Sequence, residues 1–401
     1  MGHRIWQPGK RTVLRLGNKG LAVTWLQERL KSLAYDVEVD GIYGYLTEDC
    51  VCSLQREYGL RVDGIAGPRV LELLQDKDIQ ENAPSCQLWG AVQGGQFWQQ
   101  LQRKPYEAVG QRLTGMVLYC FEVGEDGDVI GELPQAALSN QQLANVKLIP
   151  VLSNYDCGRG LYNERALEAL LKRRDMLRRF QELVRSLLAN GRLGGIGLDL
   201  QGVGMGYARR FAALAARVRK LADGCDKRLY MVLVRAAVKG GFPRGVESWV
   251  WTLPDRIILQ APREQAAREP GPRMGYQWLQ AGLKGVSRHL PAWRLLVALP
   301  GNGIAWYIGK DQGYQYLSYD EARKLAYLKQ AAIRWDNLEK VSYYDFADEK
   351  GRCRVWFDNK DSLRWKLDWL KGQHVSGIVI TPLGCEDTRI WEELGRQHLP
   401  I

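Results

Sequence analysis

From residue 87 onward, the chain repeats short apolar runs that are separated by polar segments. Eight such runs stand out, at residues 88–92, 115–123, 146–154, 195–200, 229–234, 256–261, 294–300 and 377–383. Most of them are apolar at consecutive positions rather than at alternate ones. That pattern is typical of strands buried on both faces, as in a parallel sheet covered by helices.

Helical patterns lie between several of these runs. After the fourth run, Phe211, Leu214, Val218 and Leu221 form one apolar stripe at helical spacing. After the third run, residues 164–189 have the pattern of one long amphipathic helix with its basic residues outward. Eight strands alternating with helices over about 300 residues predict an α/β fold, a (β/α)8 TIM barrel.

The segment between the seventh and eighth runs is longer than a barrel helix needs. Residues 301–356 are rich in aromatic side chains, namely Trp306, Tyr307, Tyr314, Tyr316, Tyr319, Trp335, Tyr343, Tyr344, Phe346 and Trp356. We therefore expect a small α+β insertion at about residues 301–356.

The N-terminal segment, residues 12–78, reads as a small three-helix module. Its helical patterns lie at residues 21–33, 46–60 and 68–75. Two similar turns, DGIYG and DGIAG, separate them and begin at Asp40 and Asp63. An Asp side chain can hydrogen-bond the backbone of its own turn, and Gly permits positive φ.

This pattern resembles the type-1 peptidoglycan-binding domain. The matching residues are Gly20, Val23, Leu26, Gln27, Leu30, Asp40, Gly41, Gly44, Thr47, Gln55, Gly59, Leu60, Asp63, Gly64 and Gly67. Arg69 departs from the family, which often has Thr there. The resemblance implies peptidoglycan binding, with Asp40 and Asp63 as candidate glycan contacts. Alternatively, the paired turns only shape the three-helix core.

A polar segment containing a proline follows the module, so we predict domains at 1–80 and 87–401 with a linker at 81–86. The 401 residues carry a formal charge of +11. Residues 1–80 contain 11 basic and 11 acidic side chains, so the excess lies in the remainder. Such a surface could attract nucleic acid or anionic wall polymers. No basic run with interleaved aromatic residues occurs, which argues against nucleic acid.

Other features bound the possible chemistry. The eight Cys are scattered and the four His are far apart, so we expect reduced thiols, no metal site and no cofactor. No run approaches the ~18 apolar residues of a membrane span. The first residues lack the apolar segment of a secretory signal peptide, so we expect synthesis in the cytoplasm without one.

The fourth run ends at Asp199-Leu200-Gln201 and then breaks into glycines. Side chains at positions i and i+2 of a strand point to the same face. Chemistry in TIM barrels lies at the carboxyl ends of the strands. Asp199 and Gln201 therefore form the candidate catalytic position, although an amide has no proton to transfer.

Residues 87–396 resemble glycoside hydrolase family 18, and within it the spore cortex-lytic, chitinase-like branch. The resemblance rests on the fourth strand and on the insertion, including the segments VWF and LGCEDTRIW. Family members act on N-acetylglucosamine glycans and use the substrate's own acetamido group as nucleophile. The resemblance implies that Asp199 would orient that group and that the acid would stand at Gln201.

The chain departs from this family at several strand ends. Gly194 and Gly197 replace two polar positions, Gln260-Ala261-Pro262-Arg263 stands where the family reads Met-Ala-Tyr-Asp, and Thr381 stands in place of Trp. Positioned acid–base catalysis contributes about 10²–10⁴-fold to rate, so losing the acid at Gln201 favours loss of hydrolysis. Substitute acids would be Asp156 or Glu264, but neither is expected to lie where Gln201 does relative to Asp199, and the pattern favours ordinary loop carboxylates at both positions.

The barrel could still bind glycan. Aromatic faces stack on sugar rings, and we take Trp251, Trp306 and Trp356 as candidates near the strand ends, with core packing as the alternative. Arg263 could pair with Asp199 or recognise a carboxylate, and Glu264 could contact sugar hydroxyls.

Three functions follow from these patterns. The preferred one is a carbohydrate-binding protein of the spore coat, cortex or cell wall, with a catalytically inactive barrel, that binds peptidoglycan or another N-acetylglucosamine polymer. The second is an active N-acetylglucosaminidase with a non-standard acid. The third is a protein–protein scaffold without glycan affinity. The sequence does not predict the oligomeric state.

Overall fold

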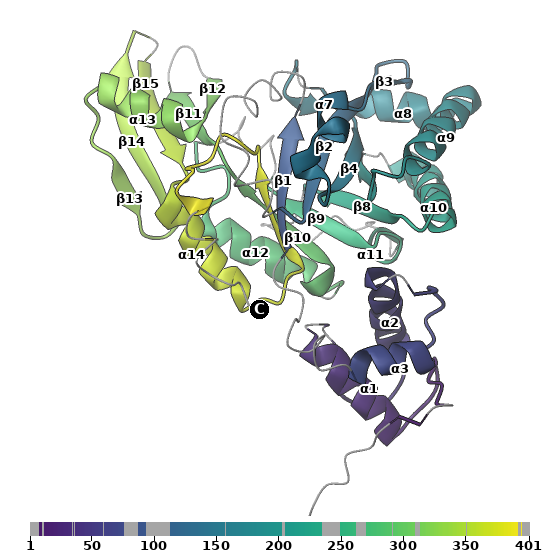
Figure 1. The fold of residues 1–401 in the computed structure, drawn as a ribbon. Coiled ribbons are helices and arrows are strands. Elements are labelled where there is room, and N and C mark those ends of the chain that lie inside the picture. Colours follow the sequence, from purple (N-terminus) through teal and green to yellow (C-terminus); the bar gives the residue numbers. More distant parts are fainter. Residues whose placement is uncertain are drawn as a thin grey trace, which may run out of the picture.

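The computed structural model describes residues 8–9, 12–33, 35, 37–58, 60–75, 87–93, 113–156, 158–202, 205–234, 249–261, 270–290, 292–308, 313–349, 351–391 and 394. These residues form a three-helix module, a barrel surrounded by helices, and a small second sheet (Figure 1). The predicted linker at 81–86 lies outside them.

The N-terminal module contains α1 (Leu21–Ser32), α2 (Tyr45–Glu57) and α3 (Pro68–Gln75). These bounds agree closely with the three predicted helical segments. The helices share one core, in which Leu26, Leu30, Val51, Leu54 and Leu71 are almost completely buried. Burial of these apolar side chains is the main force that holds so small a module together.

Eight parallel strands form the barrel. They are β1 (Gln87–Gln93), β2 (Gly115–Val123), β4 (Lys147–Ser153), β7 (Gly195–Asp199), β8 (Arg228–Leu233), β9 (Arg256–Gln260), β10 (Leu295–Pro300) and β16 (Gly377–Thr381). Because β1 pairs with both β16 and β2, the sheet closes on itself. A short strand, β3 (Val129–Gly131), runs antiparallel to β2. Each predicted apolar run is a barrel strand, which confirms the predicted fold.

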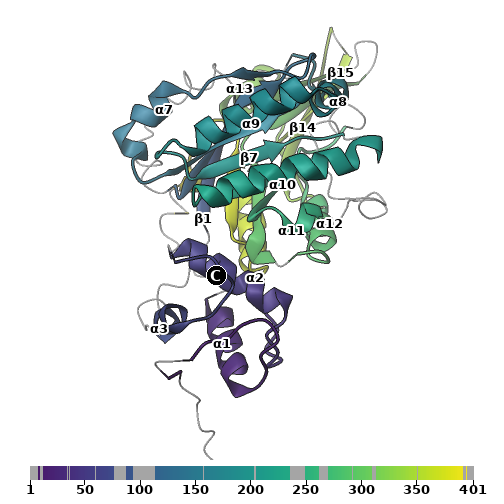
Figure 2. The same ribbon diagram turned by 90° about the vertical axis from the view of Figure 1, so that its right-hand side faces the viewer.

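Helices cover the outside of the barrel. They are α7 (Gln135–Ser139), α8 (Glu164–Lys172), α9 (Arg174–Leu188), α10 (Ala208–Gly224), α11 (Trp249–Thr252), α12 (Tyr276–Val286) and α14 (Lys360–Lys371), with short 3-10 turns η1 (Gln141–Leu143), η2 (Met205–Tyr207) and η4 (Ala292–Arg294). Figure 2 shows α9 and α10 side by side across the outside of β7. No helix in the described part of the chain is long and apolar enough to cross a membrane.

The prediction of one helix over residues 164–189 is wrong, because the chain breaks at Arg173. That residue has extended backbone angles, φ −94° and ψ 118°, and separates α8 from α9. The buried side chains of α8 end at Leu170 and Leu171, and those of α9 resume at Met176 and Phe180. An unbroken helix would place residues 174 and 178 on the buried face. Both are Arg, so the break lets each helix turn its own apolar face inward.

The predicted insertion is a five-stranded antiparallel sheet with one helix. Its elements are β11 (Gly303–Ile308), β12 (Gly313–Leu317), α13 (Tyr319–Leu328), β13 (Arg334–Asp336), β14 (Val341–Asp348) and β15 (Gly351–Phe357). The strand order is β12-β11-β15-β14-β13. Most of its aromatic residues pack into two small cores, which explains much of the composition of this segment.

Side chains fill the inside of the barrel. The interior core includes Trp89, Val151, Tyr230, Ile258 and Val379, each at most 1% exposed. Trp89 and Tyr230 contact each other with ring centroids 5.6 Å apart. The barrel is therefore a packed core rather than a channel, and any ligand must bind at an end or on the outside.

The module packs against the amino ends of the barrel strands. Trp293, immediately before β10, is 4% exposed and belongs to the core of the module. Its ring lies 5.3 Å from that of Tyr35, and the neighbouring Arg294 lies 4.0 Å from Asp49. The module thus sits at the end of the barrel opposite to the carboxyl ends of the strands (Figure 1).

Candidate functional site

The candidate catalytic position lies where β4 and β7 end side by side. Ser153 is in register with Asp199 in the parallel ladder. Just beyond them, β5 (Tyr155–Asp156) and β6 (Leu161–Tyr162) form a hairpin. The rings of Tyr155 and Tyr162 lie 5.0 Å apart and join the interior core, so the hairpin covers this corner of the barrel.

The carboxylate of Asp199 is completely buried and accepts hydrogen bonds from three side chains. The Tyr162 hydroxyl lies 3.1 Å from both of its oxygens. The Ser153 hydroxyl donates to Oδ2 at 3.2 Å, and the Gln201 amide donates to Oδ1 at 3.0 Å. A buried carboxylate needs such donors, and these three side chains supply hydrogen bonds to it.

Gln201 is held in this arrangement from two directions. Its side-chain nitrogen also donates to the carbonyl oxygen of Val232 at 2.8 Å, so the amide has two acceptors within the barrel. Its backbone is clamped by the side chain of Asn154, which accepts from Gln201 N at 2.8 Å and donates to Gln201 O at 2.9 Å. The amide therefore points toward Asp199, as the strand spacing predicts.

Neighbouring strand ends are also closed by side chains. Gln260 is 3% exposed and accepts a hydrogen bond from the Tyr119 hydroxyl at 3.2 Å. Thr381 is 5% exposed at the end of β16. A Cβ added at Gly197 would approach Val151 Cγ2 to 2.7 Å, so a polar side chain there would require repacking. Pro262, Arg263 and Glu264 lie outside the described residues, and their roles stay predictions.

The substitute acid considered from the sequence, Asp156, is engaged in the hairpin turn. Its Oδ1 accepts hydrogen bonds from the backbone of Gly158 and Arg159 at 2.8 and 2.9 Å. Sequence reasoning overlooked Glu122, near the end of β2. Burial, and secondly the charge of Asp156, raise the pKa of the Glu122 carboxyl. Glu122 is in register with Ser153, so it lies two strands away from Asp199.

The expectation that Trp251 lies near the mouth of the barrel is wrong. It belongs to α11, which precedes β9, and therefore lies at the amino end of the strands. Its ring stacks on His289 with centroids 4.7 Å apart and is 7% exposed. In this position Trp251 is part of the barrel core.

Trp306 and Trp356 are also buried, at 6% and 7% exposure. Both belong to a small core of the insertion, and the Trp306 indole donates to the carbonyl of Gly271 at 2.8 Å. Neither presents an open ring face for a sugar. Both residues therefore fit core packing, which was the alternative to stacking on a sugar.

Asp40 and Asp63 occupy equivalent places in the two turns of the module. Gln27 donates to Asp40 at 2.8 Å, and Gln55 donates to Asp63 at 2.9 Å. Each Asp also accepts from the backbone two residues ahead. The backbone N–H of Ile42, and secondly Gln27, hold the pKa of Asp40 below its usual value.

These contacts make the two Asp side chains structural parts of their turns. Asp63 additionally lines a groove of about 910 Å³ between the module and the barrel. Glycan contact by either residue stays a prediction.

The sequence names Asp199 and Gln201 as the candidate catalytic position, which stays a prediction, but not the side chains that enclose them. Ser153 and Asn154 end the third predicted apolar run, which is a signal that was available. Tyr162 returns to Asp199 only through the β5–β6 hairpin, and nothing in the local pattern indicates that contact. No cluster of three or more His, Cys, Asp or Glu suited to a metal ion occurs in the ranges that the structure describes.

Comparison with known proteins agrees with both halves of the chain. Residues 19–74 match the family model described as "putative peptidoglycan binding domain". This match confirms the resemblance of the module. The barrel region is similar to the "uncharacterized glycosylase YvbX" of Bacillus subtilis, with 18% identity over 68% of this chain and 81% of that protein.

Two solved structures are similar in fold. The spore cortex-lytic enzyme SleL of Bacillus megaterium has a TM-score of 0.64 and 18% identity, and the match covers 77% of this chain and 73% of that one. A chitinase from Chromobacterium violaceum has a TM-score of 0.65 and 18% identity, covering 79% and 100%. The barrel thus has the fold of family 18 glycosidases. At sequence identities this low, the similarity supports a shared fold and does not extend to activity.

Proposed function

We propose that this chain is a peptidoglycan-binding protein whose barrel has the glycosidase fold but does not hydrolyse glycan. The observation that carries the proposal is the state of Asp199. In an active glycosidase of family 18, the carboxylate at this position would contact the acetamido group of the substrate. Here it is 0% exposed and faces Tyr162, Ser153 and Gln201.

Two physical reasons support this proposal. Gln201 cannot transfer a proton to a leaving sugar, and that transfer is worth about 10²–10⁴-fold in rate. Exposing Asp199 to a substrate would also require Tyr162 to leave an interior position where it is 6% exposed. Both effects act against hydrolysis and neither prevents binding elsewhere on the chain.

The placement of the domains fits a protein held on a wall polymer. The module packs at the amino ends of the strands, so binding by the module leaves the carboxyl end of the barrel facing away from it. The likeness in fold to a spore cortex-lytic enzyme supports deposition in the spore coat, the cortex or the cell wall. N-acetylglucosamine polymers of the wall are then the ligands.

An active N-acetylglucosaminidase is the second candidate, and Glu122 is the observation that favours it. Burial raises the pKa of the Glu122 carboxyl, so it keeps its proton to a higher pH than an ordinary Glu, as a general acid must. However, strands lie about 4.8 Å apart, so two strand spacings separate the backbones of Glu122 and Asp199 by roughly 10 Å. That separation, together with the cover over Asp199, favours the inactive barrel.

Sedimentation and hydrolysis test the proposal together. We expect the full chain to sediment with insoluble peptidoglycan and to release no reducing ends from cortex fragments or chitin. A fragment of residues 1–80 is expected to sediment as well. Release by the unchanged protein that disappears in Asp199→Asn or Glu122→Gln would favour the enzyme. Failure of the full chain to sediment would favour a scaffold without glycan affinity.

Restoring the acid of the family is a sharper test of the site. We expect Gln201→Glu to release no product, because Asp199 remains covered and Gln260 and Thr381 remain in place. The variant should also be less stable by about 1–3 kcal/mol at pH 7, since a carboxylate would face the Asp199 carboxylate and the Val232 carbonyl.

The stability loss in Gln201→Glu should depend on pH with a definite sign. Repulsion raises the folded-state pKa of the new carboxyl above its unfolded value of about 4.3, so the folded state binds more protons. The loss should therefore be largest near pH 7 and should shrink as the pH falls toward about 4.3. Denaturant unfolding at several pH values measures it, with the exposed Gln280→Glu on α12 as control. Robust turnover by Gln201→Glu would contradict the proposal.

A further inference from the structure

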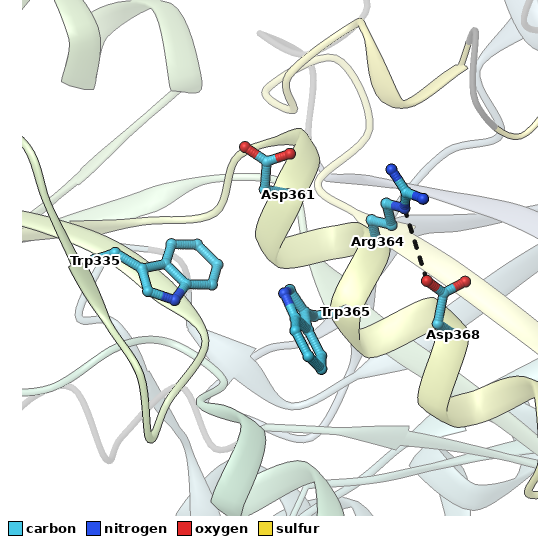
Figure 3. A pocket seen from close by; sticks show the side chains of 5 residues that line it. All are labelled: Trp335, Asp361, Arg364, Trp365 and Asp368. Carbon is cyan, nitrogen blue, oxygen red and sulfur yellow. Dashed lines mark ion pairs between the residues drawn. The ribbon is translucent and has the colours of Figure 1, made fainter.

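A second hollow lies on the outside of the barrel, far from Asp199 in the fold. It occupies about 610 Å³ between β13 of the insertion and the outer face of α14, and is lined by Trp335, Asp361, Arg364, Trp365 and Asp368. Figure 3 shows the two indole rings on facing sides of this hollow, with the carboxylate of Asp361 at one end. We name it the Trp335–Trp365 hollow.

Packing does not account for the position of Trp365. The buried side of α14 consists of Ser362, Leu363, Lys366, Leu367 and Leu370. Trp365 lies off that stripe and is 51% exposed. A large aromatic side chain left half in water beside a second Trp, at a hollow, is a candidate for a binding surface.

The ring of Trp365 is also held in place. The ammonium group of Lys340, on the turn after β13, lies 4.5 Å from the centre of the ring. A cation over one side of an aromatic ring is attracted by its π-electrons and limits its rotation. A ring fixed before binding loses less entropy when a ligand arrives.

The polar groups around the two rings narrow the class of ligand. Asp361 offers hydrogen-bond acceptors, and Asp368 lies 3.7 Å from Arg364 and 2.8 Å from Lys371, so its charge is balanced within the helix. The hollow therefore combines two indole rings with two carboxylates, one guanidinium and the Lys340 ammonium beside the Trp365 ring. These charges balance, so the hollow has no surplus of positive charge for an anion. A neutral sugar chain presents this combination, since its rings have apolar C–H faces and its hydroxyl and amide groups line the edges.

We propose that the Trp335–Trp365 hollow is a binding site for a neutral N-acetylglucosamine chain. The volume lies within the range of about 300–1,000 Å³ that is usual for ligand sites, which suits a short stretch of chain. The proposal rests on the proposed function, in that N-acetylglucosamine-containing polymers of the wall are the ligands of this chain. A second site on the same chain raises overall affinity for a polymer because its binding becomes intramolecular.

Titration of the full chain with a soluble N-acetylglucosamine hexamer tests the site. We expect calorimetry to detect binding, and Trp365→Ala and Trp335→Ala each to weaken it at least about tenfold. Because Trp365 is half exposed, its replacement leaves the fold intact. Tyr327→Ala is the matched control, since Tyr327 is an aromatic residue of the same insertion that is 83% exposed and lies outside the hollow.

Several results would overturn the proposal. They are no binding of the hexamer at about 10 mM, binding that both Trp variants leave unchanged, or an equal loss in Tyr327→Ala. A response to an apolar peptide but not to the hexamer would assign the hollow to a peptide partner instead. In each case sedimentation of the full chain with peptidoglycan is measured separately. Its failure would refute the proposed function, whereas loss of hexamer binding alone refutes only this site.

Discussion

Replacing Lys366 with alanine is expected to destabilise the barrel by about 3–5 kcal/mol. Lys366 is 0% exposed on the inner face of α14, and its ammonium group forms an ion pair with Asp358, which is 3% exposed. Removing the lysine would leave the Asp358 carboxylate buried without this partner. The cost of an uncompensated buried charge is what makes the expected effect so large.

Denaturant unfolding at pH 7 measures this effect. Lys172→Ala on α8 is the control, because its ion pair with Glu168 is largely exposed and should contribute less than about 1 kcal/mol. The double change Lys366→Met with Asp358→Leu should recover most of the loss, since it removes both charges together. A loss below about 1 kcal/mol in Lys366→Ala would show that the pair is hydrated in solution.

Loss of the Lys366–Asp358 ion pair should also affect the exposed side of α14. Trp365 precedes Lys366 and points outward, so the buried pair fixes the position of the helix that carries one wall of the Trp335–Trp365 hollow. Lys366→Ala should therefore also weaken binding of the N-acetylglucosamine hexamer, whereas Trp365→Ala should weaken binding without destabilising the barrel.

The barrel could be predicted because its strands are buried on both faces. Such strands are apolar at almost every position, and this makes their bounds visible without knowledge of their partners. The break at Arg173 was missed although the sequence contains a signal, namely Arg at positions 174 and 178 where an unbroken stripe requires apolar residues. To locate such a break, one has to check that the apolar residues stay on the same face of the helix along its whole length, and not only that each part is amphipathic.

The candidate site could be predicted only in part. Asp199 is the last residue of β7 and Gln201 follows two residues later, so a common direction of the two side chains is expected from spacing alone. The contact of Tyr162 with Asp199 depends on how a hairpin folds back, which strand periodicity does not specify. For the tryptophans, composition identified aromatic residues but not their exposure. Trp306 and Trp356 are buried, whereas Trp365 is half exposed and could have been found by its position off the apolar stripe of its helix.

Removing Gln27 is expected to have the largest effect on peptidoglycan binding. This side chain is 1% exposed, donates to Asp40 and to the Ile42 carbonyl at 2.8 and 2.9 Å, and accepts from Gly41 N at 2.8 Å. Gln55 repeats the arrangement in the second turn. A single amide thus holds the backbone of each turn to the preceding helix, which explains why both turns need a Gln upstream.

In Gln27→Ala, the buried Gly41 N–H loses its partner, at a cost of about 1–3 kcal/mol. The Ile42 carbonyl keeps the backbone N–H of Gly44 at 2.9 Å, and Asp40 loses one of its donors. A domain of this size has only a few kcal/mol of stability, so the module should unfold in a separate, earlier transition. Sedimentation with peptidoglycan should fall with it, while the transition of the barrel remains. Glu28→Gln, on the exposed side of the same helix, should change neither measurement.

The pKa of Asp40 gives this prediction an independent readout. Gln27 is the second cause, after the Ile42 N–H, that lowers this pKa, so in molecules of Gln27→Ala that remain folded it should move back toward the usual value. Because the pKa is lowered in the folded state, the stabilisation is present above the unfolded value of about 3.9 and is lost as the pH falls through the folded pKa. Titration by NMR measures the shift. An unchanged pKa of Asp40 together with undiminished peptidoglycan binding would mean that the turn keeps its structure without the Gln27 side chain.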